Sequence, residues 1–191
     1  MKKFALATEM EYKIEIDEIE NRRDFLSFTD SSGAKGVSRM DFELAKPFIK
    51  ATRDVLSMMA MTEVVPGTPY VKKNNQAVGD VTGIIGMSGN KSGTFSITFS
   101  RECAVYIVRQ MLGDEIGDVV QDAQDAVGEI TNMISGQARI GLEAFGVSMV
   151  GTTPSIVLGD NHTISHQTKA PVMAVPFKCA GGEFTIEFCF E

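Results

Sequence analysis

The chain has 191 residues, of which 43% are hydrophobic and 23% are charged, a composition typical of a globular protein with one sizeable core. Its formal net charge of -7 argues against the positive field with which proteins attract nucleic acid or anionic membrane surfaces. No apolar run approaches the roughly 20 residues of a membrane span, so we expect a cytoplasmic protein that inserts into no membrane.

Residues 1–40 differ from the rest of the chain, and we interpret them as an N-terminal extension of unknown role. "YKIEID" and "DFLSFTD" alternate apolar and polar residues, which predicts two short strands. "DSSGAKG" is typical of a flexible joint. Residues 41–191 then form the main domain.

Three helices are predicted in this domain, over residues 41–60, 101–112 and 118–145. Pro47 falls inside the first pattern, so the regular helix begins near it. Ser100 is the expected N-cap of the second helix, and Gly113 is expected to end it in the left-handed conformation. Gly146 is the expected stop of the long third helix.

The predicted strands lie in "AVGDVTGIIGMSG", "TFSITFS", "VSMVGTTPSIVLG", "PVMAVPFKC" and "GEFTIEFCFE". "GNKSG" joins the first two as a hairpin, and "AGGE" joins the last two. "VVPGTPYV" breaks helicity after the first helix. We expect Phe95, Ile97 and Phe99 to face inward, in an α+β fold whose antiparallel sheet packs against long helices.

The long helix has one apolar and one polar face. Its predicted core arc consists of Val120, Ala123, Val127, Ile130, Ile134, Ala138 and Phe145. The opposite arc consists of Asp125, Glu129, Asn132, Gly136, Arg139 and Glu143. Glu129 and Asn132 therefore project into solvent as neighbours one turn apart.

Helix propensity does not explain this polar face. Asn132 and Gly136 are poor choices for an exposed helix interior, where glycine costs about 1 kcal/mol relative to alanine. They indicate a surface that another molecule approaches closely. A merely solvated face explains the same spacing, and Glu18 and Asn21 repeat it elsewhere in the chain.

The sequence gives little support for a metal site or for a framework of disulfide bonds. Cys103, Cys179 and Cys189 are odd in number and form no CxxC pair, so we expect buried free thiols. His162 and His166 have the spacing of two zinc ligands on a helix, but they lie between predicted strands without a third ligand. The acidic run of Asp114, Glu115, Asp118, Asp122 and Asp125 surrounds a helix start, where carboxylates favour the dipole without binding metal.

The segment "DAVGEITNMISGQAR" resembles the ExxN helix of the CheC/CheX/FliY family of response-regulator phosphatases. "PYVKKNNQAVGDVTGIIGMSG" resembles the stretch after the first helix in CheX-type members, and the likeness covers residues 41–191. CheC-type members carry two ExxN helices. The first helix here, "FELAKPFIKATRDVLSMMA", has no such motif, which favours the CheX type.

The resemblance implies a protein aspartyl-phosphate phosphatase acting on a phosphorylated CheY-like response regulator. Asn132 would orient the attacking water, and Glu129 would pair with a lysine of the receiver. Gly136 and Arg139 are candidates for partner docking. This chain would bind no cofactor, because the response regulator would supply the Mg²⁺ ion.

The resemblance also implies a homodimer, which an unpaired edge at "FTIEFCF" would favour. The alternative to the enzyme is a binding or scaffold module that docks a receiver or a flagellar switch component without hydrolysis.

Overall fold

The computed structural model describes residues 43–74, 76–113, 119–159, 162–166 and 168–191. The predicted extension of residues 1–40 lies outside these ranges, as does its boundary with the main domain. Within the described part of the chain, no helix has the length and hydropathy that crossing a membrane requires.

The three predicted helices are present as α3 (Ala45–Ala60), α4 (Arg101–Leu112) and α5 (Val119–Glu143). Pro47 is the third residue of α3, where its missing N–H would have no partner within the helix. The Ser100 hydroxyl accepts a hydrogen bond from the Cys103 amide, which confirms the predicted cap of α4. Gly113 ends α4 with φ 78° and ψ -162°, so φ is positive as predicted but the residue lies outside the left-handed helical region.

The strands are β1 (Val65–Pro66), β2 (Tyr70–Val71), β3 (Val81–Gly89), β4 (Ser92–Phe99), β5 (Met149–Gly151), β6 (Ser155–Leu158), β7 (Met173–Cys179) and β8 (Gly182–Phe190). They form one antiparallel sheet in the order β1-β7-β8-β4-β3-β5, in which β2 also pairs with β7 and β6 also pairs with β3. The predicted hairpins β3–β4 and β7–β8 are both present. The α+β class is confirmed.

"VVPGTPYV" follows the end of α3 at Ala60, which confirms that it breaks helicity, and it also contains the short strands β1 and β2, which were not predicted. One prediction about strand boundaries was wrong. "VSMVGTTPSIVLG" was expected to be one strand, but it divides into β5 and β6. Pro154 lies in the break and has no N–H to donate to the neighbouring strand β3.

The predicted exposed edge was also wrong. "FTIEFCF" belongs to β8, which lies between β4 and β7 and pairs with both. The outer positions belong to β1 and β2 beside β7, and to β5 and β6 beside β3. Strand order depends on pairing between distant parts of the chain, so the alternation within β8 does not show whether the strand is central.

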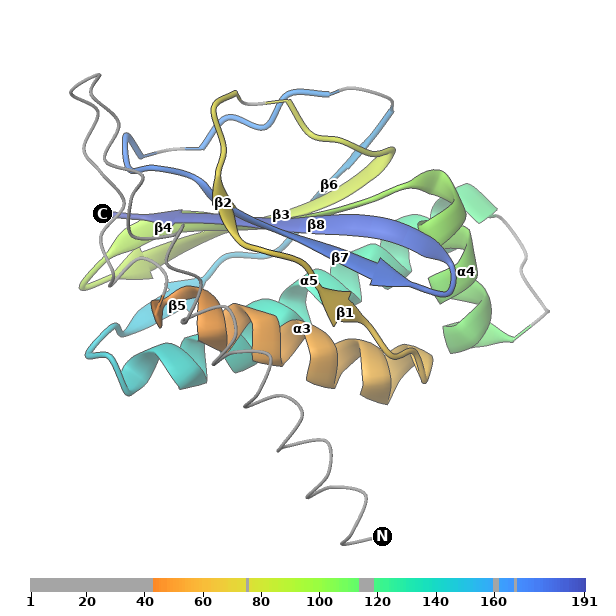
Figure 1. Ribbon diagram of the computed structural model, residues 1–191, viewed down its shortest axis with the longest axis horizontal. Coiled ribbons are helices and arrows are strands. Elements are labelled where there is room, and N and C mark those ends of the chain that lie inside the picture. Colours follow the sequence, from red (N-terminus) through yellow and green to blue (C-terminus); the bar gives the residue numbers. More distant parts are fainter. Residues whose placement is uncertain (1–42, 75, 114–118, 160–161, 167) are drawn as a thin grey trace, which may run out of the picture. The chain divides into compact units, whose positions relative to one another are not determined.

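Helices α3 and α5 lie side by side against one face of the sheet (Figure 1). The residues predicted to face inward on β4 are fully buried under them. Phe48 of α3 stacks on Phe95 of β4 and Phe188 of β8, with ring centroids 5.2 Å and 4.7 Å apart. This aromatic layer is the centre of the core, and it supports the face of the sheet on which α5 rests.

The core arc of α5 is confirmed at five positions, which are Ala123, Val127, Ile130, Ile134 and Ala138. Phe145 is 42% exposed, contrary to the prediction, because the helix ends at Glu143 before the arc reaches it. The side chain of Val120 lies outside the described residues. Thr131, Ser135 and Leu142 are buried as well, since α5 packs against β3 in addition to α3. Burial on two flanks leaves only a narrow exposed stripe.

Candidate functional site

The exposed stripe of α5 carries the two residues of the predicted motif. Glu129 and Asn132 are both exposed, while the two residues between them, Ile130 and Thr131, are buried. No hydrogen bond or ion pair engages either exposed side chain among the described residues. The carboxylate and the carboxamide are therefore both exposed to solvent, on a helix whose opposite side is buried against α3 and β3.

A close contact with the sheet sets the position of this helix. The Thr131 hydroxyl donates to the Val127 carbonyl one turn earlier and faces Gly83 on β3. A Cβ atom at Gly83 would lie 2.0 Å from the Thr131 Oγ1, so only glycine permits this approach. One turn later, the Ser135 hydroxyl lies 3.7 Å from the sulfur of Met87 on the same strand. These contacts bring α5 very close to β3 in the part of the helix that carries the motif.

Arg139 connects the second half of α5 to the edge of the sheet. Its Nε donates to the Ser135 carbonyl at 3.2 Å, and its Nη1 donates to the Met149 carbonyl of β5 at 3.4 Å. The guanidinium is thus bonded within the chain, and its role in partner docking stays a prediction.

Two glycines of α5 differ in whether the surrounding side chains leave room for a Cβ atom. A Cβ atom at Gly141 would lie 2.9 Å from the Cβ of Pro47, so Gly141 allows α3 and α5 to pack closely. A Cβ atom at Gly136 would meet only the Nη2 of Arg139, at 3.9 Å. Packing within the chain therefore does not explain Gly136, which lies on the exposed side one turn after Asn132.

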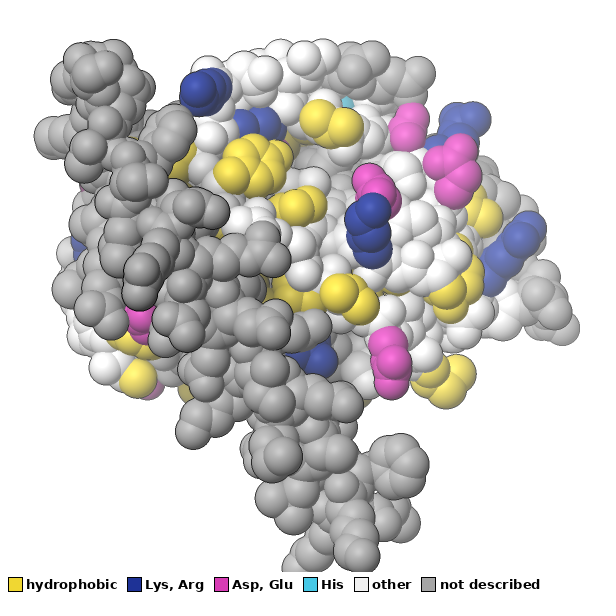
Figure 2. Space-filling view, viewed as in Figure 1, with side chains coloured by type: hydrophobic (Ala, Val, Ile, Leu, Met, Phe, Trp, Pro, Cys, Tyr) yellow, Lys and Arg dark blue, Asp and Glu magenta, His cyan; other side chains and the backbone are white. Residues whose placement is uncertain are grey.

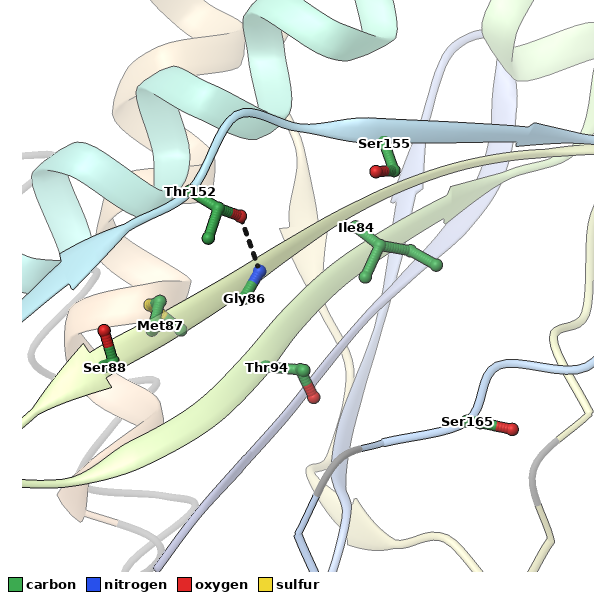
Figure 3. Close-up of a pocket in the computed structure, with 8 residues that line it drawn as sticks. All are labelled: Ile84, Gly86, Met87, Ser88, Thr94, Thr152, Ser155 and Ser165. Carbon is green, nitrogen blue, oxygen red and sulfur yellow. Dashed lines mark hydrogen bonds between the residues drawn. The ribbon is translucent and has the colours of Figure 1, made fainter.

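The motif does not line a cavity. A pocket of about 400 Å³ lies beside β3 and β4 (Figure 3), where the Gly86 amide donates to the Thr152 hydroxyl at 3.2 Å. Its lining consists of Ile84, Gly86, Met87, Ser88, Thr94, Thr152, Ser155 and Ser165. Glu129 and Asn132 are absent from this lining. The candidate site is a projecting helix face, a shape that suits a large partner better than a small ligand.

No three histidine, cysteine, aspartate or glutamate side chains converge on a common point within the described ranges. Asp114, Glu115 and Asp118 of the acidic run lie outside those ranges. The two histidines bind separate partners. His162 contacts the Thr82 hydroxyl at 2.6 Å and the Gly159 carbonyl at 2.7 Å, whereas His166 contacts Thr94 and Glu187.

Sequence reasoning missed a buried polar cluster on the sheet face opposite the helices. Lys72 and His166 both contact Glu187 of β8, with side chains only 6%, 4% and 2% exposed. The His166 Nε2 lies 3.4 Å from the Glu187 Oε2. Cys189 lies next to them and 3.3 Å from the hydroxyls of Thr94 and Thr168. These residues come from separate parts of the chain, so no local motif could have predicted their meeting.

The cluster changes the protonation of two of its members. Burial by itself lowers the pKa of His166, but hydrogen bonds with Cys189 and Glu187 outweigh burial and raise the pKa to about 9. Burial raises the pKa of Cys189, but hydrogen bonds from His166, Thr168 and Thr94 outweigh it and lower the pKa. His166 is therefore a cation at neutral pH, paired with the Glu187 carboxylate.

On the face shown in Figure 2, hydrophobic side chains are interspersed with polar and charged ones. On the stripe itself, Ile140 is 71% exposed and follows Gly136 by one turn of α5. The stripe thus passes from Glu129 and Asn132 to an apolar side chain near its C-terminal end.

Comparison with known proteins agrees with this fold. The family of the chemotaxis phosphatase CheX matches residues 81–178, which include all of α5. A solved structure from Desulfovibrio vulgaris Hildenborough is 60% identical, with a TM-score of 0.75 over 78% of this chain and 97% of that chain. The chemotaxis protein CheX from Desulfovibrio desulfuricans is 58% identical, with a TM-score of 0.75 over 78% of this chain and 99% of that chain.

Among curated proteins, the CheY-P phosphatase CheX of Thermotoga maritima is 26% identical over 121 residues, which are 63% of this chain and 78% of that protein. Together with the antiparallel sheet and the three helices, these matches confirm the resemblance that the ExxN helix indicated. The chain belongs to the CheX family.

Proposed function

We propose that this protein hydrolyses the phospho-aspartate of a CheY-like response regulator, with Glu129 and Asn132 as its active residues. The observation that carries the proposal is the joint exposure of these two side chains on α5 of a CheX-family chain. The Thermotoga maritima relative is named as a CheY-P phosphatase, which supports the same substrate class here.

Asn132 would act by positioning water. Its carboxamide both donates and accepts hydrogen bonds, so it can orient a water molecule without removing a proton from it. The water oxygen attacks phosphorus in line with the aspartyl oxygen, and the P–O bond to the aspartate breaks. The products are a free aspartate carboxylate and inorganic phosphate, with the water protons passing to phosphate and solvent.

The receiver would supply the cation that this reaction needs. A divalent ion neutralises charge on the transferred phosphoryl group, and an acidic pocket that already holds the phospho-aspartate is the natural place for it. This chain then contributes geometry and hydrogen bonds, and Mg²⁺ belongs to the substrate complex.

Glu129 would direct docking. Its carboxylate is exposed one turn from Asn132, where it can form a charge-assisted hydrogen bond with a lysine of the receiver. Such a contact would fix the rotation of α5 in the receiver's site and bring the Asn132 carboxamide to the phosphoryl group.

Asn132→Ala tests the central step. The exposed side chain opens no core cavity when it is removed, so stability should change by no more than about 0.5 kcal/mol. Turnover of a phosphorylated receiver with Mg²⁺ should fall by roughly 10²-fold or more, because misplacing a reacting group by about 1 Å can cost that much in rate. Gln121→Ala is the matched control, since Gln121 is another exposed polar residue of α5.

Two results would contradict the proposal. Wild-type turnover in Asn132→Ala would remove the assigned role. A wild-type protein that binds phosphorylated receivers without accelerating their hydrolysis would favour the scaffold alternative.

Gly136 would allow the receiver to approach the helix closely. Gly136→Ala should stabilise the fold by about 0.5–1 kcal/mol, because it removes a helix-interior glycine without a clash. The same change should weaken receiver binding at least severalfold. Gly128→Ala is the control, since its Cβ would make only ordinary contact with Ile156 at 3.7 Å. A stabilised Gly136→Ala variant with unchanged receiver affinity would exclude this docking role.

We also propose that the chain forms a homodimer. Support comes from the outer strands β5 and β6, where Val150 and Leu158 are 67% and 40% exposed. Contact between copies would remove such apolar surface and the unpaired strand edge from water. Light scattering at micromolar concentration measures the state directly, and a monomer would contradict the proposal.

A further inference from the structure

Two cysteines that are far apart in sequence meet in the fold. Cys103 is the third residue of α4, and Cys179 is the last residue of β7. They are 76 positions apart, yet their sulfur atoms lie 3.5 Å from each other, and both thiols are free. Neither cysteine belongs to α5, which carries the candidate phosphatase site.

Close packing holds the two sulfur atoms together. The turn between β7 and β8 lies directly against α4, where a Cβ atom at Gly181 would come within 2.3 Å of Tyr106. The Ser100 amide donates to the Glu183 carbonyl at 3.3 Å, and the Cys103 amide donates to the Ser100 hydroxyl. The start of α4 is therefore bonded to the hairpin that carries Cys179, and the thiols are preorganised.

We propose that Cys103 and Cys179 form a reactive dithiol, which a small-molecule disulfide oxidises to an intramolecular disulfide bond. The bond requires the sulfur atoms to close from 3.5 Å to about 2.05 Å, a distance that side-chain rotation can supply. The site takes an oxidant of the low-molecular-weight disulfide class, because thiol–disulfide exchange needs no metal or enzyme.

Exposure determines the order of the two exchange steps. Cys103 is fully buried, and burial together with the neighbouring Cys179 raises the pKa of its thiol. Cys179 is only partly buried and can meet the oxidant. Its thiolate attacks one sulfur of the oxidant, forms a mixed disulfide and releases one small thiolate.

Cys103 then completes the reaction. Its thiolate attacks the sulfur of Cys179, and the second small thiolate leaves. The two protein thiols are oxidised, the oxidant is reduced to two small thiols, and two protons pass from the protein to them.

The third cysteine provides an internal contrast. Cys189 is buried on the opposite face of the sheet, where its sulfur contacts the hydroxyls of Thr94 and Thr168 and no other cysteine. It should take no part in the exchange. The product should therefore be a single species that joins α4 to β7, and it should unfold at a higher temperature because the cross-link constrains the unfolded chain.

The test is oxidation of the full-length native protein with oxidised glutathione, followed by acid quenching, intact mass spectrometry and peptide mapping. We expect a loss of about 2 Da, a Cys103–Cys179 cross-linked peptide, and a Tm several degrees above that of the reduced protein. Dithiothreitol should reverse all three changes. Cys179→Ser should abolish the cross-link, whereas Cys189→Ser should retain it.

Other outcomes would overturn the proposal. These are an unchanged mass, a stable glutathione adduct on the wild-type protein, a disulfide that includes Cys189, or a disulfide between two chains. Because Cys179 is only partly buried, its serine variant should fold, and circular dichroism of the reduced variants confirms that a lost cross-link does not reflect unfolding.

Discussion

Gly83→Ala is the most direct test of how the sheet positions the motif helix. The substitution leaves α5 chemically unchanged and adds one methyl group beneath it. That carbon would lie 2.0 Å from the Thr131 Oγ1 and 3.0 Å from the Thr131 Cβ. Real Cβ contacts are essentially never shorter than 3.0 Å, so something must shift. Turning the Thr131 hydroxyl aside would break its bond to the Val127 carbonyl, so we expect α5 and β3 to separate by roughly 1 Å instead.

Two effects of opposite sign set the stability change. Overpacking a well-packed site typically costs 1–3 kcal/mol, whereas replacing glycine by alanine in a strand returns roughly 0.5–1 kcal/mol of backbone entropy. These ranges give a net loss of about 0–2.5 kcal/mol, centred near 1 kcal/mol, which corresponds to a fall in Tm of roughly 2–4 °C for a domain of this size. A 1 Å misplacement at a catalytic group can cost about 10²-fold in rate, so turnover should fall much further than stability suggests.

Urea unfolding and receiver dephosphorylation, measured at saturating receiver, separate these effects. Thr131→Ala combined with Gly83→Ala removes the 2.0 Å contact and should restore most of the turnover, while Thr131→Ala alone is the control. Gly83→Ala with wild-type turnover would refute the reasoning that this contact positions α5. A double variant as impaired as Gly83→Ala alone would refute the assigned cause.

Glu187→Gln should lower the free energy of unfolding by about 3–5 kcal/mol in urea titrations, because it leaves the buried cations Lys72 and His166 without their carboxylate; a loss below about 1 kcal/mol would contradict this. The raised pKa of His166 means that its protonated form stabilises the fold fully below about pH 6.5, and that this contribution is lost as pH rises through about 9. An NMR titration of the His166 ring should therefore give a pKa well above 6.5 in the wild-type protein and a lower one in Cys189→Ser, because the hydrogen bond with that thiol is the first cause of the rise; an unshifted pKa in the wild-type protein would count against it. Glu129→Ala should weaken receiver binding and reduce its dependence on ionic strength, and calorimetry at two salt concentrations that shows neither change would exclude the proposed ion pair.

Local rules were sufficient for the helices and for the candidate site. The 3.6-residue repeat places Glu129 and Asn132 on the face opposite Ile130 and Ile134, whatever the helix packs against. The Ser100 cap depends only on a hydroxyl and an amide three residues apart. The motif and its exposure could therefore be predicted before any tertiary contact was known.

Sequence patterns did not predict contacts between segments that lie far apart in the chain. The alternation of β8 defines its two faces, but not its place between β4 and β7, which turned a predicted edge into the centre of the sheet. It also gave no sign that Glu187 would meet Lys72, 115 residues earlier in the chain. Side-chain periodicity records which face of an element is buried, and contains no information about which element covers it.

The sequence by itself determined the helices, the Ser100 cap, the hairpins and the polar stripe of α5, because these depend on backbone geometry and neighbours within a few residues. Only the tertiary structure decided how closely α5 approaches β3, and which glycine makes that close approach possible. Gly83 looks like any strand glycine in the sequence, and its function depends on Thr131, 48 residues later. The meeting of Cys103 and Cys179 was decided in the same way, because close contacts between distant residues follow from how whole elements pack.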